Sequence, residues 1–198
     1  MLTIGGVGPG NPKYLTLDVM EAMNNAKCIL GFGRIAKSLK MINKNIISIN
    51  KVDEVLDYIE KEEDILLLAS GDPNFFGIVQ FIQNKGIKIK EILPGLSSFQ
   101  YLMSKLQKPW QDAKFISLHG RKGDLDKVRK NKLSIILTDK DNNPAYISKK
   151  LKELNIRGNM YIGFNLSHDD EEIMIKKIGE DIEDISPLAI VVIENEMD

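Results

Sequence analysis

Residues 2–12 read Leu-Thr-Ile-Gly-Gly-Val-Gly-Pro-Gly-Asn-Pro, and this stretch decides the fold that we predict. A short apolar strand runs directly into a loop rich in glycine and proline, and a helical pattern opens at Thr16. Glycine lets the backbone come close to a ligand, and proline stiffens the turn. A glycine-rich turn after the first strand of an α/β chain is a common ligand-binding edge.

The loop does not match the two best-known nucleotide motifs. A phosphate-binding P-loop needs GxxxxGK[ST], and no Lys-Ser or Lys-Thr follows here. A dinucleotide fingerprint needs GxGxxG opening a helix directly, whereas Gly6, Gly8 and Gly10 have another spacing and two prolines delay the helix. Taken alone, the loop is equally compatible with an ordinary tight turn.

Apolar and amphipathic segments alternate along the chain. Apolar runs predict strands over residues 65–69, 87–93, 115–118, 133–137, 160–163 and 188–193. Helical spacing predicts helices over residues 17–26, 52–59 and 146–154, the first with Leu17, Met20 and Ala22 or Met23 on its buried face. The alternation predicts an α/β fold with two α/β lobes and mainly parallel sheets. Because residues 108–112 break the pattern, we place the lobes at 1–110 and 111–198.

The composition excludes several classes of function. A net charge of −1 gives no sign of a nucleic-acid or membrane surface. Cys28 is the single cysteine and sits in an apolar run, which predicts a core position, and with only His119 and His168 beside it no metal site is expected. No apolar stretch reaches the ~18 residues that a membrane span needs, and no signal peptide is visible. We therefore expect a cytoplasmic protein.

Several predicted strands end in loops that suit a ligand. In open α/β sheets, ligands bind beyond the carboxyl ends of the strands. Each loop also has a plain structural interpretation. Ser70-Gly71-Asp72-Pro73 fits a type I turn, and Ser97 fits a helix cap. His119-Gly120-Arg121 fits either a solvated basic loop or a carboxylate site, and Asp139 fits a turn better than an acid or base.

Taken together and in this order, these loops resemble the tetrapyrrole methylase family, whose members use S-adenosylmethionine. The resemblance covers nearly the whole chain and rests on Gly6-Val7-Gly8-Pro9-Gly10, Ser70-Gly71-Asp72-Pro73 with Phe76-Gly77, Pro94-Gly95 with Ser97-Ser98, and Pro187-Leu188-Ala189-Ile190-Val191. Further motifs are most similar to the branch that methylates carbon C5 of cobalt-precorrins: Tyr14-Leu15-Thr16, Ser117-Leu118-His119-Gly120-Arg121, Leu137-Thr138-Asp139 with Asn143-Pro144, and Asn165-Leu166-Ser167.

The resemblance implies two α/β lobes with the methyl donor in a cleft between them, usually in a homodimer. It implies donor contacts at Pro9, Ser70, Gly71, Asp72, Ser97, Ser98, Leu137 and Ala189. It also implies that the first glycine loop, with Gly8 and Gly10, faces the tetrapyrrole. A separate enzyme would then methylate and decarboxylate at C15. Two positions depart from the family pattern, Asn11 in place of Asp and Phe164 in place of Glu, and each alters either substrate contacts or local packing.

The chemistry needs little beyond alignment, because the sulfonium methyl is already electrophilic and the nucleophile is a carbon of the macrocycle. His119 and Asp72 are the candidates for removing a proton. Arg121 is the candidate for binding substrate carboxylates, with Lys122 and Arg34 as lesser ones. The alternatives are a family member with another ring position, a diphthine synthase that modifies a translation factor, or a nucleotide-binding module without catalysis.

Overall fold

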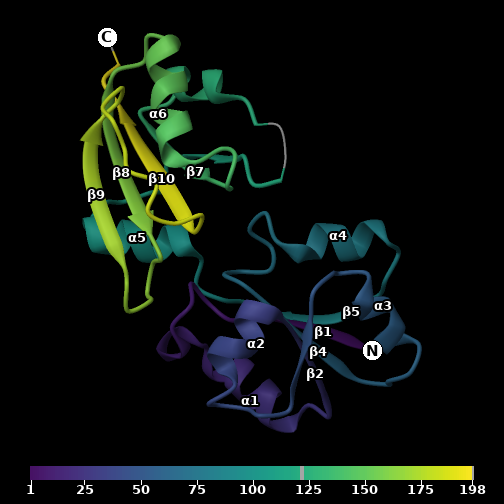
Figure 1. Cartoon of the computed structure of the whole chain (residues 1–198). Helices are drawn as coiled ribbons and strands as arrows, with labels where there is room; N and C mark the ends of the chain where they lie inside the picture. The colour runs from purple at the N-terminus through teal and green to yellow at the C-terminus, as the bar shows by residue number, and fades with distance from the viewer. Residues whose placement is uncertain (121–122, 198) are drawn as a thin grey trace. The chain divides into compact units, whose positions relative to one another are not determined.

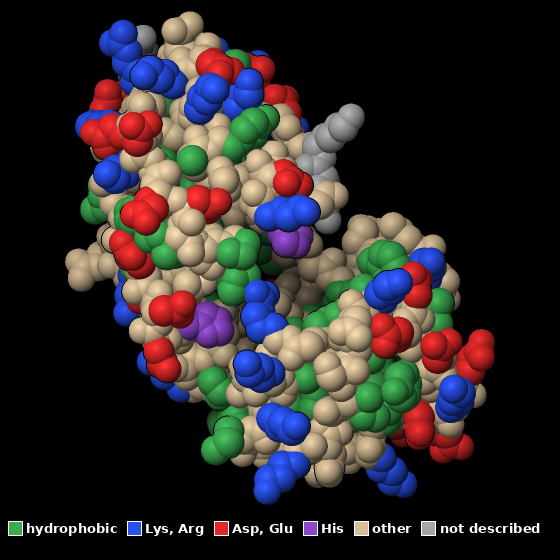
Figure 2. Space-filling view, in the orientation of Figure 1, with side chains coloured by type: hydrophobic (Ala, Val, Ile, Leu, Met, Phe, Trp, Pro, Cys, Tyr) green, Lys and Arg blue, Asp and Glu red, His purple; other side chains and the backbone are tan. Residues whose placement is uncertain are grey.

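The computed structural model describes residues 1–120 and 123–197, and the chain forms two compact units, Met1–Ser98 and Phe99–Asp198 (Figure 1). The sequence prediction draws its boundary after residue 110, whereas the compact units meet at Ser98 and Phe99. Positive and negative side chains are interspersed on the face of each unit that Figure 2 shows, consistent with the net charge of −1. No helix within the described residues is long and apolar enough to cross a membrane.

The first unit is a parallel sheet with helices on both faces. Its strands run in the order β3-β2-β4-β1-β5, and every pairing recorded for them is parallel. The elements are β1 Leu2–Gly6, a 3₁₀ turn at Pro12–Tyr14, α1 Leu17–Asn25, β2 Cys28–Phe32, α2 Gly33–Leu39, β3 Ile46–Ile49, α3 Glu54–Ile59, β4 Ile65–Ala69, α4 Ile78–Asn84 and β5 Ile89–Leu93.

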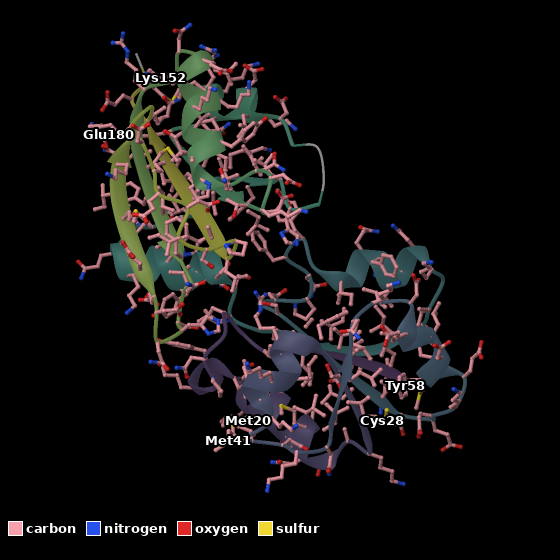
Figure 3. All side chains as sticks on the ribbon, viewed as in Figure 1. Met20, Cys28, Met41, Tyr58, Lys152 and Glu180 are labelled. Atoms are coloured by element: carbon pink, nitrogen blue, oxygen red, sulfur yellow. The ribbon has the colours of Figure 1, made fainter. Side chains whose placement is uncertain are left out.

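The central strand β4 supplies apolar side chains to both faces of this sheet. Leu66 and Leu68 pack with the buried residues of α1 and α2, whereas Ile65 and Leu67 pack with those of α3 and α4. Such a strand reads as a continuous apolar run because each face of a parallel sheet is covered. Cys28 (Figure 3) packs with Ile65 and Leu67 on the face covered by α3 and α4, and it is only 4% exposed, as predicted. Burial raises the pKa of its thiol. Its role is therefore packing.

Helix α1 buries Met23, one of the predicted residues, but not Leu17 or Met20. Thr16 is its N-cap, with the Val19 amide donating to Thr16 Oγ1 at 3.3 Å. Val19 and Met23 are the buried residues, whereas Leu17 is 82% exposed and Met20 39% exposed. The prediction for Leu17 and Met20 is wrong because the cap sets where the first turn begins, and that turn directs Val19 toward the sheet.

The second unit has a mixed sheet in the order β6-β7-β10-β8-β9. Its elements are α5 Ser98–Leu106, β6 Lys114–Ser117, a 3₁₀ segment at Leu125–Lys130, β7 Leu133–Leu137, α6 Pro144–Glu153, β8 Gly158–Phe164, β9 Glu172–Lys177 and β10 Ala189–Asn195. Ile147 and Leu151 of α6 pack with Ile136 and Ile162 on one face. On the other face, Phe99 of α5 meets Phe115 of β6, with ring centroids 4.9 Å apart.

The expectation of mainly parallel sheets holds for the first unit and is wrong for the second. Only the pairing of β6 with β7 is parallel among the described strands of this sheet, while β10 is antiparallel to both β7 and β8, and β8 is antiparallel to β9. Strands β7 and β8 run in the same direction with β10 between them, and helix α6 forms the crossover that connects them. No helix follows β8 within the described residues, so the chain reverses into β9, and β10 then inserts between β7 and β8.

Candidate functional site

Three loops meet at the carboxyl ends of β1, β4 and β5. Gly8 and Gly71 exchange backbone hydrogen bonds, with the Gly71 amide donating to Gly8 O at 2.9 Å and the Gly8 amide donating back at 3.3 Å. A Cβ on Gly6 would lie 2.6 Å from the Gly95 nitrogen, and one on Gly95 would lie 2.7 Å from the Gly6 carbonyl carbon. These glycines therefore let three backbones touch, which no side chain at Gly6 or Gly95 would permit.

Asp72 joins two of these loops through backbone amides. Its Oδ1 accepts from the Asn74 amide at 2.8 Å, and its Oδ2 accepts from the Gly95 amide at 3.3 Å. Each carboxylate oxygen that already accepts a backbone hydrogen bond has fewer lone pairs left to direct at a substrate. The geometry therefore favours Asp72 as a brace for the Gly71 and Gly95 loops over Asp72 as a base.

In the second unit, three loop segments are linked at one end of the sheet. His119 Nδ1 lies 2.9 Å from the Thr138 carbonyl oxygen, and Thr138 Oγ1 donates to the Ala189 carbonyl at 2.6 Å. A carbonyl only accepts, so the His119 contact assigns the proton to Nδ1. The Nε2 atom of an exposed imidazole is then left with a lone pair.

Asp139 anchors the turn after β7. Its Oδ1 accepts from the amides of Asp141 at 3.0 Å and Asn142 at 2.7 Å, and its Oδ2 accepts from the Gly120 amide at 3.0 Å. These hydrogen bonds, led by those from Asn142 and Gly120, lower the pKa of Asp139 from 3.8 to about 2. A carboxylate held in this way is structural, in agreement with the turn interpretation of the sequence.

The depressed pKa of Asp139 predicts an acid-sensitive turn. A carboxyl whose folded pKa is below its unfolded pKa contributes stability above the unfolded value, and that contribution is lost as the pH falls through the folded value. We therefore expect the unfolding midpoint to drop between about pH 4 and pH 2. Asp139→Asn should lower the midpoint at pH 7 and flatten this acid dependence, as thermal unfolding across that range would reveal. An identical pH dependence in both proteins would contradict the role of the carboxylate.

The two departures from the family pattern have local explanations. Phe164 is fully buried in the apolar cluster beside α6. Asn11 caps the 3₁₀ turn at residues 12–14, with the Lys13 amide donating to Asn11 Oδ1 at 3.0 Å. After Phe164, Asn165 adopts a positive φ of 46° and accepts from the Ser186 hydroxyl at 2.6 Å. This brace joins loops far apart in sequence, which no local pattern signals.

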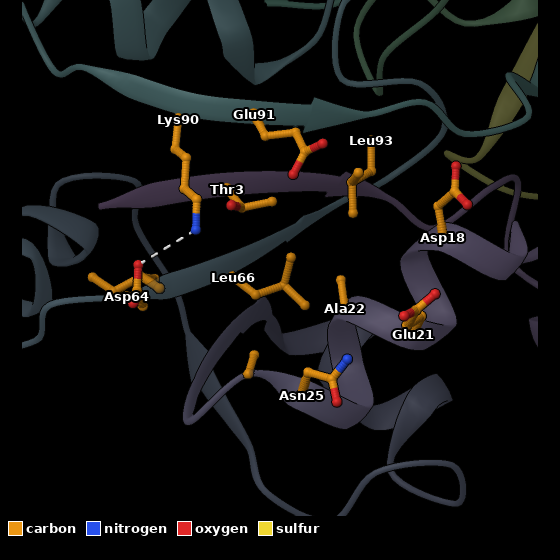
Figure 4. A pocket seen from close by; sticks show the side chains of 12 residues that line it. Thr3, Asp18, Glu21, Ala22, Asn25, Asp64, Leu66, Lys90, Glu91 and Leu93 are labelled. Atoms are coloured by element: carbon orange, nitrogen blue, oxygen red, sulfur yellow. Dashed lines mark ion pairs between the residues drawn. The ribbon is translucent and has the colours of Figure 1, made fainter.

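The groove of about 520 Å³ drawn in Figure 4 is separate from these loops. Its floor contains Leu66 and Leu93, and its rim carries the carboxylates of Asp18, Glu21 and Glu91. None of its residues belongs to the loops 5–12, 70–73 or 94–98. Asp64 and Lys90 also line the groove, so four carboxylates stand against one ammonium group, and a ligand rich in carboxylates would be repelled. The groove is therefore a poor candidate for the tetrapyrrole.

The structure places the predicted site residues in two sets. In the first unit, Gly8, Pro9 and Gly10 follow β1, Ser70, Gly71 and Asp72 follow β4, and Ser97 and Ser98 follow β5. In the second unit, Leu137 ends β7, Ala189 begins β10, and His119 follows β6. Arg121 and Lys122 lie outside the described residues, and Arg34 is exposed on α2. No group of three metal-binding side chains occurs in the described part of the chain.

Comparison with known proteins decides the family. The sequence profile of the tetrapyrrole (corrin/porphyrin) methylases matches residues 1–180. The chain belongs to this family. It is therefore a methyltransferase whose methyl donor is S-adenosylmethionine. This methylase is 28% identical to the probable cobalt-precorrin-7 C(5)-methyltransferase of Methanocaldococcus jannaschii, over 99% of each chain. It is also 28% identical to the cobalt-precorrin-7 C(5)-methyltransferase of Salmonella typhimurium, over 98% of this chain and 99% of that one.

Solved structures agree with the fold of this methylase. A precorrin-6Y methylase of cobalamin biosynthesis from Archaeoglobus fulgidus superposes with a TM-score of 0.80 at 20% identity, covering 100% of this chain and 98% of that one. A uroporphyrin-III C-methyltransferase from Thermus thermophilus, solved with S-adenosylhomocysteine, gives a TM-score of 0.77 at 20% identity, over 97% of this chain and 91% of that one. The two-sheet α/β architecture of this methylase is thus the fold of its family.

Proposed function

We propose that this methylase transfers a methyl group to carbon C5 of cobalt-precorrin-7 in cobalamin biosynthesis. The observation that carries the proposal is the full-length similarity to two relatives named for that reaction. A relative named as a probable cobalt-factor III C(17)-methyltransferase is similar over only 60% of this chain and 37% of its own length. The four motifs that begin at Tyr14, Ser117, Leu137 and Asn165 favour the same C5-methylating branch.

The glycine loops of the first unit fit the donor that the family uses. Around Gly71 a Cβ would meet only the Ser97 Cα, at 3.8 Å, so the loop leaves open space beside its backbone. We propose that the donor is held by eight residues: Pro9, Ser70, Gly71, Asp72, Ser97, Ser98, Leu137 and Ala189. When bound, the donor supplies an electrophilic methyl group on a sulfonium. The protein then has chiefly to bind and orient, which contributes up to ~7–11 kcal/mol.

For the proton that leaves the macrocycle, the geometry favours His119 over Asp72. The Nδ1–H of His119 donates to the Thr138 carbonyl, so Nε2 is the ring nitrogen that this contact leaves available. Both oxygens of Asp72 are already engaged by amides. We propose that His119 Nε2 accepts the proton and that Asp72 keeps the donor loops in place.

The remaining elements of the proposal concern the substrate and partners. We propose that Gly8 and Gly10 face the tetrapyrrole and that Arg121 binds its carboxylates, because a guanidinium binds a carboxylate in a bidentate manner. We also propose a homodimer in the cytoplasm. A separate enzyme would carry out methylation and decarboxylation at C15.

The proposal is tested first by titrating the purified protein with S-adenosylhomocysteine in a calorimeter. We expect micromolar affinity and about one site per chain, as for a protein that binds its cofactor product specifically. Cobalt-precorrin-7 should then gain one methyl group from labelled donor, with the label at C5. Uroporphyrinogen III and cobalt-factor III serve as control substrates and should remain unlabelled. Methylation of either control instead of cobalt-precorrin-7 would reassign the substrate, and absence of binding to folded protein would reject the donor site.

A further inference from the structure

Two serine hydroxyls are buried without a hydrogen-bond partner among the residues that the structure describes. They are Ser117 Oγ, in a residue 7% exposed, and Ser134 Oγ, in a residue 0% exposed. Buried polar groups are almost always hydrogen-bonded, because an unpaired one loses its contacts with water and gains nothing in return. Each of these hydroxyls therefore either remains unpaired in the packed core or forms its hydrogen bond with a bound ligand.

The two serines occupy opposite ends of the same pair of strands. Ser117 is the last residue of β6 and pairs with Leu137, the last residue of β7. Ser134 pairs with Lys114, the first residue of β6, at the far end of that ladder. Only Ser117 lies at the edge from which the loops of His119 and Asp139 extend.

The two serines also lie on opposite faces of the sheet. Side chains alternate along a strand, so Ser117 shares a face with Phe115, which meets Phe99 of α5. Ser134 shares its face with Ile136, which belongs to the apolar cluster beneath α6. Ser134 is thus enclosed by a packed core, whereas Ser117 lies on the other face, at the end of the strand.

Ser117 lies beside Leu137, one of the proposed donor residues of this unit, whereas the side chain of Ala189 faces the apolar cluster at α6 on the other side of the sheet. In the sheet, Leu137 pairs with Ser117 on one side and with Ile190 on the other, and Ala189 directly precedes Ile190. Paired residues on neighbouring strands direct their side chains to the same face. The Ser117 hydroxyl therefore lies on the same face and at the same end of the sheet as the Leu137 side chain.

We propose that the Ser117 hydroxyl hydrogen-bonds the bound S-adenosyl donor and contributes to its affinity. A serine hydroxyl can donate one hydrogen bond and accept up to two. It therefore suits the polar edge of an adenosine that is held against apolar side chains. The inference rests on the proposed function, because it needs the donor to reach Leu137. It differs from the resemblance to the family, which implies no contact at Ser117.

The decisive variant is Ser117→Ala, with Ser134→Ala as the matched control. One lost hydrogen bond to a neutral ligand group should raise the dissociation constant for S-adenosylhomocysteine by about three- to tenfold. The ligand-free Ser117→Ala protein should unfold at the same temperature as wild type or higher, because its hydroxyl has no partner to lose. Ser134→Ala should likewise keep or raise the unfolding temperature, and it should bind S-adenosylhomocysteine as wild type does.

The outcomes separate this inference from the proposed function. If wild type binds S-adenosylhomocysteine and Ser117→Ala binds equally well, the inference is wrong and the donor site stands. If Ser117→Ala lowers the unfolding temperature with unchanged affinity, the hydroxyl is structural and the inference is again wrong. A rise confined to the Michaelis constant for the tetrapyrrole would assign Ser117 to the substrate instead. Wild type that fails to bind overturns the donor site and this inference together.

Discussion

Replacing Gly95 by alanine is expected to lower the affinity for S-adenosylhomocysteine about 100-fold and to destabilise the fold by about 1–3 kcal/mol. The new Cβ would overlap the Gly71 carbonyl oxygen and lie 2.7 Å from the Gly6 carbonyl carbon. Backbone atoms at the ends of buried strands have little room to move, so the loops after β1, β4 and β5 must separate. Calorimetric titration and denaturant unfolding of the variant measure the two effects.

Gly33→Ala is the matched control for this substitution. Gly33 is the first residue of α2. The atom nearest to a Cβ built on Gly33 would be Ser48 Oγ, at an ordinary van der Waals distance of 3.7 Å. We expect Gly33→Ala to keep wild-type affinity and to be neutral or slightly stabilising, because alanine favours a helix. A Gly95→Ala protein that binds S-adenosylhomocysteine as wild type does would show that these three loops are remote from the donor.

His119→Ala should lower kcat about 100-fold while leaving the affinity for S-adenosylhomocysteine unchanged. General base catalysis contributes about 10²–10⁴-fold, and the exposed position of His119 leaves its Nε2 atom accessible to a substrate. The same exposure should admit free imidazole, so adding imidazole to His119→Ala is expected to restore part of the lost rate. Methyl transfer from labelled donor, with and without imidazole, measures both effects.

Asp72→Asn is the comparison that separates proton transfer from loop bracing. An amide in place of the carboxylate presents an NH₂ group toward one of the two backbone amides that Asp72 accepts from. We expect weaker binding of S-adenosylhomocysteine and no response to imidazole. If imidazole rescues neither variant and His119→Ala also loses donor affinity, His119 is a positioning residue for the loop and the base must be sought elsewhere.

The sequence predicts the turns after β1, β4 and β5 because glycine and proline mark turns by their own backbone preferences. Gly71 and Pro73 predict a turn after a buried strand, independently of their tertiary surroundings. The sequence does not predict the close approach among Gly6, Gly71 and Gly95, because this contact depends on which strands become neighbours in the sheet. The brace from Asp72 to Gly95, across 23 residues of sequence, follows from the same strand order and has no local signal.

The strands that the sequence analysis missed include two short or charged ones, β3 and β9, besides the buried strand β2. Strand β3 has only four residues, and β9 contains three charged side chains, so neither has the long buried apolar run that reveals β4. The sequence also does not predict the direction of β10, because its apolar residues fit either a parallel or an antiparallel central strand. The role of Asp139 was easier to predict, since a short polar side chain after a strand commonly caps its own turn.

The position of β10 in its sheet has a consequence for how the chain is made. This strand pairs with β7 on one side and with β8 on the other, yet it is the last of the described strands to be synthesised. The first unit, residues 1–98, draws its whole sheet from segments that leave the ribosome much earlier. Domains fold as units and in order of synthesis. We therefore expect the glycine loops of the first unit to form before β10 joins β7 and β8 into one sheet.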